Sequence, residues 1–236
     1  MNKLDQVVSL IERNRISTAQ VSDALGKAGV LNHFKALTRG YHKVGKVNYI
    51  YTHSGSNYDL HKQIQFVEED SIVFVEGFDC DGKALLGELV AKYLLLYKKC
   101  KALIVSGLVR DAHSLVKEKY PIWSFGTTPL GCVNSPVQLT PSLEKNISLS
   151  QTKFEDGIII ADDSGVVLIE KEMTSADLIK KLEFMELQED IWFYCIDTLK
   201  WSTYETICQK SYMKDTSLLP LILRRKLEEV DFYESK

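Results

Sequence analysis

The residues best suited to chemistry are an arginine and an aspartate side by side, Arg110 and Asp111, which follow an apolar run. An arginine fork binds a carboxylate through two parallel hydrogen bonds, and an aspartate can hold magnesium or manganese mainly through water. Adjacent residues of an extended segment point in opposite directions, so one side chain could face a carboxylate ligand while the other faces a metal ion. Such an ion can polarise the carbonyl of a 2-oxo acid and stabilise its enolate. Taken alone, the dipeptide is commonplace, and a surface ion pair is the simpler explanation.

The neighbouring elements strengthen the chemical interpretation. The run Ala102–Val105 is apolar and is followed by Ser106-Gly107, which is typical of a buried strand that delivers Arg110 to the surface. Gly87 precedes an apolar, lysine-rich segment that we expect to be helical. The first amide groups of a helix lack intrahelical partners and attract anions. Residues 87–111 therefore predict a pocket for a small, negatively charged molecule.

Other candidate residues have competing interpretations. Glu88 would either approach the water shell of a metal ion or stabilise the first turn of its helix by roughly 0.3–1 kcal/mol. His113 follows Asp111 closely enough to be a ligand or proton donor, although a surface histidine is the simpler interpretation. Cys132 has no evident base, so we predict no nucleophilic role for it. The sequence contains no Gly-x-Gly-x-x-Gly or P-loop pattern.

Composition narrows the class of protein. The 236 residues suffice for one large core with an appendage, and 45% hydrophobic with 26% charged residues is ordinary for a globular protein. A net charge of −3 does not favour nucleic acid or an anionic membrane as a partner. No apolar run reaches a membrane span of about 18 residues, and no secretion signal is evident. The cysteines, which form no Cys-x-x-Cys pair, fit a reducing cytoplasm: Cys80, Cys100, Cys132, Cys195 and Cys208.

The second half of the chain predicts further elements. Residues 158–169 read as two strands joined by a turn at Asp162-Asp-Ser-Gly165, and residues 137–149 are expected to be extended. A helix should begin near Thr174 and run to about Leu187. The last fifty residues are rich in aromatic side chains and predict one or two more helices. We therefore expect one catalytic-type α/β domain over residues 1–175 and a helical extension over 176–236, packed on the core or on a neighbouring subunit.

Five motifs occur together in a characteristic order. They are Ser17-Thr-Ala-x-Val-Ser-Asp-Ala-Leu25, Gly87-Glu-Leu-Val-Ala91, Gly107-x-Val-Arg-Asp111, Phe125-Gly-Thr-Thr-Pro129 and Ala161-Asp-Asp-x-Gly-Val-Val167. Together they resemble the ribonuclease E activity regulator A-like family, over about residues 15 to 175. That family includes class II 4-hydroxy-4-methyl-2-oxoglutarate aldolases, which also decarboxylate oxaloacetate, and non-catalytic ribonuclease regulators.

The resemblance implies a fold, an assembly and a site. The fold would be α/β, of the β/β/α swivelling-domain (phosphohistidine-domain-like) type, in homotrimers or pairs of trimers. Arg110 would bind the pyruvate carboxylate, Asp111 would hold a divalent magnesium or manganese ion, and Glu88 would lie near the metal's water shell. Substrate would contact Gly87, Glu88, Leu89, Val90 and Arg110, and the catalytic set would be Arg110, Asp111 and Glu88.

The resemblance also implies an activity. The leading expectation is a metal-dependent carbon–carbon lyase on a small 2-oxo acid, acting as a pyruvate-releasing aldolase or oxaloacetate decarboxylase through an enolate. The rival is a non-catalytic regulator that binds a protein such as a ribonuclease, with the aromatic tail as a docking surface. A third possibility is a family member specialised for another acid. Its motivation is that Ser106 replaces a common acidic residue, the stretch from Glu88 to Arg110 is one residue longer than usual, and the tail is long. We expect the helix end near Lys98–Lys101 to absorb the extra residue.

Overall fold

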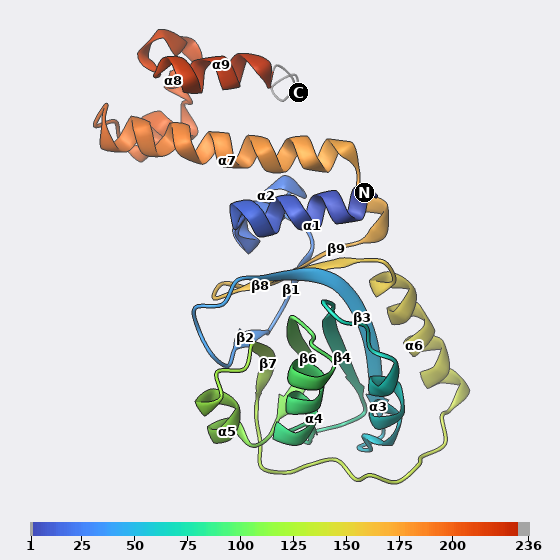
Figure 1. Cartoon of the computed structure of the whole chain (residues 1–236). Helices are drawn as coiled ribbons and strands as arrows, with labels where there is room; N and C mark the ends of the chain where they lie inside the picture. Colours follow the sequence, from blue (N-terminus) through green and yellow to red (C-terminus); the bar gives the residue numbers. More distant parts are fainter. Residues whose placement is uncertain (1, 231–236) are drawn as a thin grey trace. The chain divides into compact units, whose positions relative to one another are not determined.

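The structure is a computed structural model that describes residues 2–230 (Figure 1). The chain divides into two compact units, Met1–Ser175 and Ala176–Lys236. The first unit is a mixed α/β fold and the second is helical. Among the described residues, none of the helices combines the length and apolar composition that crossing a bilayer requires.

The strands of the first unit form one sheet of nine strands within residues 2–230, in the order β1-β9-β8-β3-β4-β6-β7-β2, with β5 beside β6. The bounds are β1 (Val30–Leu31), β2 (Lys35–Ala36), β3 (Lys43–His53), β4 (Ile72–Phe78), β5 (Ala84–Leu86), β6 (Ala102–Val109), β7 (Ile122–Thr127), β8 (Ile158–Asp162) and β9 (Gly165–Ile169). Strands β3, β4, β6 and β7 are parallel to their neighbours in that series, whereas β8 and β9 form an antiparallel hairpin. The predicted hairpin at residues 158–169 is therefore confirmed.

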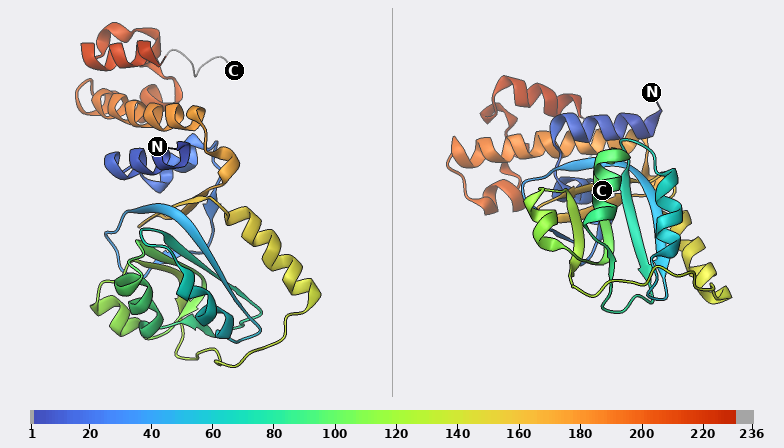
Figure 2. Two further views of the ribbon diagram at one scale, coloured as in Figure 1. Left: turned by 45° about the vertical axis from the view of Figure 1, so that its right-hand side comes forward. Right: turned by 60° about the horizontal axis from the view of Figure 1, so that its bottom comes forward.

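The helices of this unit follow the strands in the chain. They are α1 (Lys3–Asn14), α2 (Thr18–Ala24), α3 (Tyr58–Gln63), α4 (Glu88–Lys92), α5 (Ala112–Lys117) and α6 (Pro141–Phe154), with short helices η1 (Ile64–Phe66), η2 (Tyr93–Tyr97) and η3 (Lys171–Met173). In Figures 1 and 2, α3, α4 and α5 lie on one side of the parallel strands. Because each parallel connection carries a helix, the carboxyl ends of β4, β6 and β7 meet at one edge of the sheet.

The parallel strands are buried on both faces. Successive side chains of a strand point to opposite faces, so Val73 and Val75 of β4 join a core with α3 and α4, whereas Ile72 and Phe74 join a second core. The second core also contains Ile159 and Ala161 of β8 and Phe154 of α6, so β8 contributes to the packing of that face. The sheet edge that carries Arg110 is thus held by packing from both sides.

The expectation of extended structure over residues 137–149 is wrong, because α6 begins there. Thr140 caps this helix by accepting a hydrogen bond on Oγ1 from the Leu143 N–H at 3.3 Å, and Pro141 occupies the first turn. Buried Leu143 and Ile147 are four residues apart, as on one face of a helix. Leu149, which the alternating pattern predicts to lie in a strand, is exposed on this helix. The threonine-proline start is the signal that this interpretation missed.

The helix after Gly87 changes its winding in η2, which is a π-helix. The Lys98 N–H donates to the Tyr93 carbonyl at 2.9 Å, five residues back rather than four. A π turn holds one residue more than an α turn, so it accommodates an insertion without shifting the residues on either side. The expected insertion near Lys98–Lys101 stays a prediction, and the π turn lies just before it, at Tyr93–Tyr97.

Asp162, the first aspartate of the Ala161-Asp-Asp motif, has a structural role. Its carboxylate accepts hydrogen bonds from the Thr18 N–H at 2.8 Å, the Thr18 hydroxyl at 2.7 Å and the Ser164 N–H at 2.8 Å. Ser17 caps the same end of α2 in a reciprocal capping box with Gln20. The motif thus ties the start of α2 to the β8–β9 turn.

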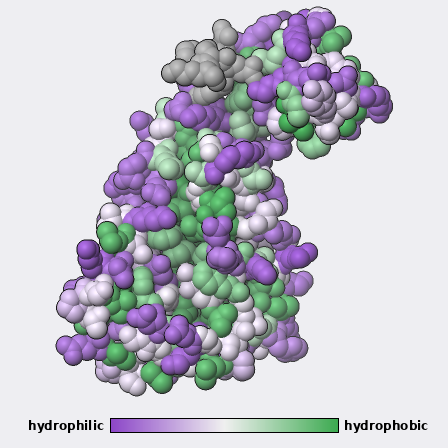
Figure 3. Space-filling view, turned by 180° about the vertical axis from the view of Figure 1, so that it is seen from behind, coloured by the Kyte–Doolittle hydropathy of each residue, from purple (hydrophilic) through white to green (hydrophobic). Residues whose placement is uncertain are grey.

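The second unit consists of helices α7 (Ala176–Asp197), η4 (Tyr204–Cys208), α8 (Ser211–Lys214), η5 (Thr216–Leu218) and α9 (Leu221–Glu229). Helix α7 continues to Asp197, ten residues past Leu187, so the predicted end near Leu187 is wrong. A small cluster of buried side chains holds the unit together: Leu187, Ile191, Cys195, Tyr212 and Leu219. Other apolar side chains of the unit are exposed, including Phe193 and Ile222, and Figure 3 shows hydrophobic residues among hydrophilic ones on the visible face of these helices.

Candidate functional site

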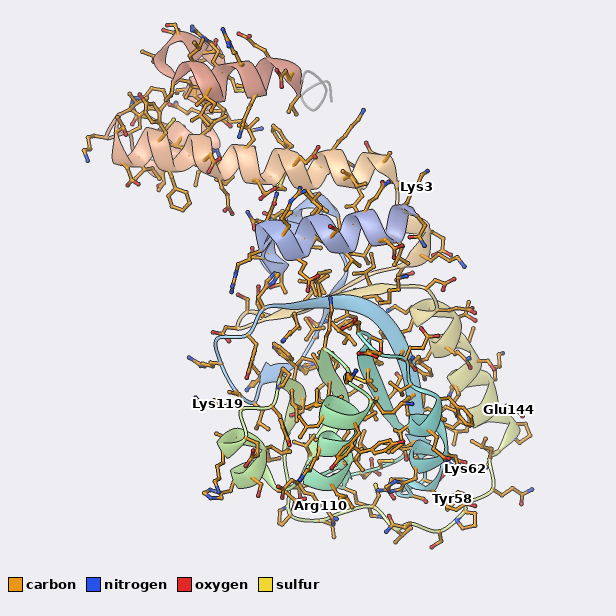
Figure 4. The ribbon with its side chains drawn as sticks, in the orientation of Figure 1. Lys3, Tyr58, Lys62, Arg110, Lys119 and Glu144 are labelled. Carbon is orange, nitrogen blue, oxygen red and sulfur yellow. The ribbon has the colours of Figure 1, made fainter. Side chains whose placement is uncertain are left out.

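The candidate site lies where two parallel strands end. Leu86, the last residue of β5, pairs with Val109, the last residue of β6, so Gly87 and Arg110 leave the sheet side by side. The Arg110 N–H donates to the Leu86 carbonyl at 3.0 Å and fixes this arrangement. Figure 4 shows Arg110 below α4, at the same edge of the unit as Tyr58 and Lys62 of α3. Ligands of open α/β sheets bind outside the carboxyl ends of the strands, and this edge has that position.

Asp111 joins the two connections that leave these strands. Its Oδ2 accepts a hydrogen bond from the Glu88 N–H at 3.0 Å, at the first residue of α4. Its backbone is in the left-handed region, with φ 58° and ψ 33°, where it precedes the first residue of α5. Aspartate tolerates this region better than most residues, and such conformations cluster at functional sites. The hydrogen bond from the Glu88 N–H therefore holds the carboxylate against the start of α4.

Position 87 requires glycine because the side chains of Arg110 and Asp111 pack closely against its backbone. Its φ of −138° is accessible to any residue, but a Cβ atom added there would lie 2.3 Å from Asp111 Oδ2 and 2.8 Å from Arg110 Cγ. Gly131 has a similar relation to Arg110, since its Cβ would lie 2.5 Å from Nη1. Two glycines thus leave the space that the arginine and aspartate side chains fill.

Arg110 and Asp111 do not form a close ion pair. Arg110 Nε lies 3.7 Å from Asp111 Oδ2, which is beyond a good hydrogen bond, and the side chains are 51% and 43% exposed. A contact of this length between exposed groups contributes little to stability. The guanidinium fork therefore remains accessible to a ligand, and the interpretation as a plain surface ion pair does not account for the packed glycines beside it.

A cavity of about 170 Å³ lies beside the two side chains. It brings together four of the five residues expected to bind substrate, Gly87, Leu89, Val90 and Arg110, with Asp111, the expected metal ligand. Glu88 does not line the cavity, because its amide binds Asp111 and its half-buried side chain lies elsewhere. His113, the other acid–base candidate, is exposed on α5 and also lies outside that set.

Sequence reasoning missed the opposite wall of the cavity, which contains Asn57 and His61 from α3 and its start, and Gly131, Cys132 and Asn134 from the loop after β7. This loop is held by parallel bridges of Gly131 with Ala84 and of Val133 with Ser56. The Asn57 Oδ1 atom is buried without a hydrogen-bond partner among the described residues. The order of elements could have predicted this wall, because both segments follow parallel strands and so reach the same edge of the sheet.

Few acidic or other metal-ligating side chains line the cavity. Within residues 2–230 no group of three or more His, Cys, Asp or Glu side chains could hold a metal ion. Asp111 supplies one carboxylate, whose Oδ1 accepts no hydrogen bond from the part of the chain that the structure describes. One carboxylate with open space beside it fits a magnesium or manganese ion that keeps most of its waters, and does not fit a closed zinc site.

Comparison with known proteins shows the family of the first unit. Residues 18–168 match the family model described as RraA-like: Aldolase/RraA. A crystal structure of an uncharacterized protein from Pseudomonas syringae pv. tomato str. DC3000 is similar, with a TM-score of 0.62 and 18% identity over 86% of this chain and 96% of that chain. The structure of Streptomyces coelicolor RraAS2, described as an unusual member of the RNase ES inhibitor RraA protein family, has a TM-score of 0.59 and 19% identity over 78% and 94% of the two chains. At these identities the likeness shows the fold alone.

Proposed function

The chain belongs to the RraA-like family of aldolases and RraA proteins, and from that membership we propose that it is a divalent-metal-dependent lyase acting on a small 2-oxo acid. The reaction would be of the pyruvate-releasing aldolase or oxaloacetate decarboxylase type. One observation carries the proposal: an accessible guanidinium and a carboxylate with an open oxygen line the same small cavity, beside the first turn of α4.

Arg110 would bind the carboxylate next to the 2-oxo group. Its fork offers parallel N–H donors, and the side chain lines the cavity. Of the amides in the first turn of α4, that of Glu88 is used by Asp111, while Leu89 and Val90 line the cavity. These donors would hold the substrate carboxylate at the start of α4, beside Asp111.

Asp111 would hold the divalent ion, directly through Oδ1 or through water. When bound, magnesium or manganese supplies positive charge that polarises the 2-oxo group and stabilises negative charge on the enolate. Asp111 is suited to this role because the Glu88 amide anchors Oδ2, while no described residue donates a hydrogen bond to Oδ1. Cleavage leaves the electron pair on the carbon that becomes the pyruvate methyl group, and a proton from water completes the product. Glu88 would orient that water if its side chain turns toward the cavity.

We further propose a homo-oligomeric, cytoplasmic enzyme with a swivelling β/β/α first unit. The parallel strands packed between α3 and α4 on one side and β8 on the other support the fold assignment. Exposed apolar side chains near the cavity support an assembly, because Leu89 is 81% and Tyr97 70% exposed in the single chain. A trimer, or a pair of trimers, would cover such residues.

The test is pyruvate release from oxaloacetate by the full chain with magnesium or manganese, measured with a coupled lactate dehydrogenase assay. Wild-type protein should turn over, and Arg110→Ala and Asp111→Ala should each lose nearly all of the metal-dependent rate. His113→Ala is the matched control, because this neighbour lies outside the cavity lining. A protein that turns over none of a panel of 2-oxo acids, although it is folded, would reject the proposal.

The alternative is a non-catalytic regulator that binds a protein such as a ribonuclease. Exposed Phe193, Leu221 and Ile222 of the second unit are the observation in its favour. This alternative predicts a stoichiometric complex with a ribonuclease that persists in Asp111→Ala and is lost when these apolar residues are replaced by serine. Turnover that depends on Asp111 supports the lyase, whereas binding without turnover supports the regulator.

A further inference from the structure

Two cysteines lie together next to the candidate site. Cys80 follows β4, and Cys132 follows β7 and lines the cavity. Both are partly buried and pack against the same hydrophobic core, and neither is in a disulfide. Their separation in sequence hides this proximity, because it arises from the neighbouring positions of parallel strands and their loops. The pair is therefore a feature of the fold that no local motif predicts.

Backbone hydrogen bonds hold the two segments in place. The Lys83 N–H donates to the Cys80 carbonyl at 2.9 Å, and the Cys132 N–H donates to the carbonyl of the next residue, Ala84, at 3.3 Å. Gly55 links the same segments, because its carbonyl accepts from the Val133 N–H at 3.0 Å while its own N–H interacts with the Cys80 sulfur. Each cysteine is thus fixed through main-chain contacts to shared neighbours.

The two thiols differ in character. In its protonated form Cys80 donates to the Phe78 carbonyl at 3.3 Å. A hydrogen bond from Cys132, the Gly55 N–H and the charge of Lys83 lower the pKa of Cys80 to about 7, against opposing effects of burial and Asp79. The same hydrogen bond and burial raise the pKa of Cys132. One sulfur is therefore suited to act as a nucleophile and the other to remain a thiol beside it.

We propose that Cys80 and Cys132 form a reversible oxidation site, in which Cys80 attacks a small peroxide and Cys132 resolves the product. The Cys80 thiolate takes an oxygen atom from hydrogen peroxide: an S–O bond forms, the O–O bond breaks and the other oxygen leaves as hydroxide, which a proton converts to water. The Cys132 thiol then displaces the sulfenic oxygen as a second water and forms the S–S bond. Overall, two thiols are oxidised to a disulfide while one peroxide is reduced to two waters.

The disulfide would also affect the candidate site. Gly131 precedes Cys132 and is packed against Arg110, since a Cβ atom added to this glycine would lie 2.5 Å from Nη1. Drawing the Cys132 sulfur into bonding distance of Cys80 pulls this loop and moves the surface against which the guanidinium rests. Oxidation should therefore weaken carboxylate binding at Arg110. This consequence depends on the proposed function, whereas formation of the disulfide does not.

The test is oxidation of the full chain with a small excess of hydrogen peroxide, followed by alkylation and peptide mapping without reduction. The expected product is a Cys80–Cys132 cross-linked peptide that disappears after treatment with dithiothreitol. Cys132→Ser should stop at a Cys80 sulfenic acid, which dimedone traps, and Cys80→Ser should leave Cys132 as a thiol. Cys208→Ser is the matched control, because this exposed cysteine of the second unit should not change the yield of the cross-link.

Two outcomes would overturn the proposal. One is that Cys80 and Cys132 are both recovered as free thiols under conditions that oxidise Cys208. The other is a cross-link that forms equally well in urea-unfolded protein, since the folded geometry would then play no part. In a second arm, oxidised wild-type protein should lose oxaloacetate turnover and regain it with dithiothreitol, while Cys80→Ser resists. A cross-link with unchanged turnover rejects the coupling to Arg110, and absent turnover in reduced protein rejects the lyase while leaving the oxidation site supported.

Discussion

Gly87 and Asp111 stand so close together that a methyl group on Gly87 would lie 2.3 Å from the carboxylate Oδ2. The same carboxylate oxygen accepts the Glu88 N–H, so glycine and aspartate together define how α4 meets the end of β6. Gly87 thus contributes to the site because its missing side chain leaves the space that Asp111 and Arg110 occupy. This relationship makes Gly87 a more selective probe of the site than either charged residue.

Gly87→Ala should therefore inactivate a folded protein. The new Cβ would also meet Arg110 Cγ at 2.8 Å, so both side chains must turn away and the Asp111–Glu88 hydrogen bond must lengthen or break. We expect metal-dependent turnover to fall at least about a hundredfold, because misplacing a catalytic group by roughly 1 Å has a cost of that order. Thermal unfolding, which should shift much less than activity, checks that the variant is folded.

Gly131→Ala is a milder change of the same kind, and it should reduce activity less than Gly87→Ala. Its Cβ would meet Arg110 Nη1, the far end of a flexible side chain, which can rotate away at small cost. The expected effect is a raised KM for the 2-oxo acid with a smaller change in kcat. An equal loss in both alanine variants would mean that the close packing at Asp111 is not the source of the effect.

Arg110→Lys tests whether geometry or charge binds the carboxylate. Lysine keeps the positive charge but offers no fork, and so loses one of two parallel hydrogen bonds. A hydrogen bond to a charged group contributes about 1.5–3 kcal/mol, which corresponds to roughly a 10- to 100-fold loss in kcat/KM. The assay is steady-state kinetics with oxaloacetate beside Arg110→Ala. Full activity in the lysine variant would show that charge alone suffices.

The sequence predicts one side of the site better than the other, for a physical reason. Gly87 and Arg110 belong to segments whose apolar patterns predict a helix and a buried strand. Local patterns are therefore enough to predict that these two residues lie close together. Asn57 and Cys132 reach the cavity through bridges between loops, and the pairing of those loops depends on the order of strands in the sheet. Strand order is a non-local property that no single stretch encodes.

The error at α6 has a different origin. Apolar residues spaced by two near residue 137 and again at 147–149 suggested strands, but the intervening Thr140-Pro141 starts a helix. Side-chain capping and a proline in the first turn are local signals that outweigh a short alternating pattern. Asp162 shows a second limit of reasoning from sequence. It belongs to a family motif, yet its hydrogen bonds to Thr18 serve the structure rather than the site.

Asp162→Ala and Thr18→Val should destabilise the first unit in a coupled manner. The aspartate accepts both the hydroxyl and the N–H of Thr18, and its loss leaves the start of α2 without these acceptors. We expect Asp162→Ala to lower the free energy of unfolding by about 2 kcal/mol, as for hydrogen bonds to a charged group. In urea denaturation, the double variant should be less destabilised than the sum of the singles by roughly 1 kcal/mol. Strict additivity would mean that the two residues act independently.

The pH dependence of Cys80 alkylation gives a test that needs no substrate. Its pKa is lowered to about 7, so the reactive thiolate is lost as the pH falls through 7 and is nearly fully formed above pH 8. The rate of modification by iodoacetamide, followed at this residue by mass spectrometry, should therefore rise with a midpoint near pH 7. In urea-unfolded protein the midpoint should return to about 8.5, the value for an unperturbed thiol.

Three substitutions test which neighbours lower the pKa of Cys80 and which raise it. Cys132→Ala removes the largest stabilising interaction of the thiolate and should move the midpoint furthest upward. Lys83→Met removes a nearby positive charge and should raise it by less. Asp79→Asn removes a negative charge that opposes ionisation, so its midpoint should fall. If all three variants kept the wild-type midpoint, the thiolate would owe its stability to none of these neighbours, and the paired arrangement of Cys80 with Cys132 would lose its chemical basis.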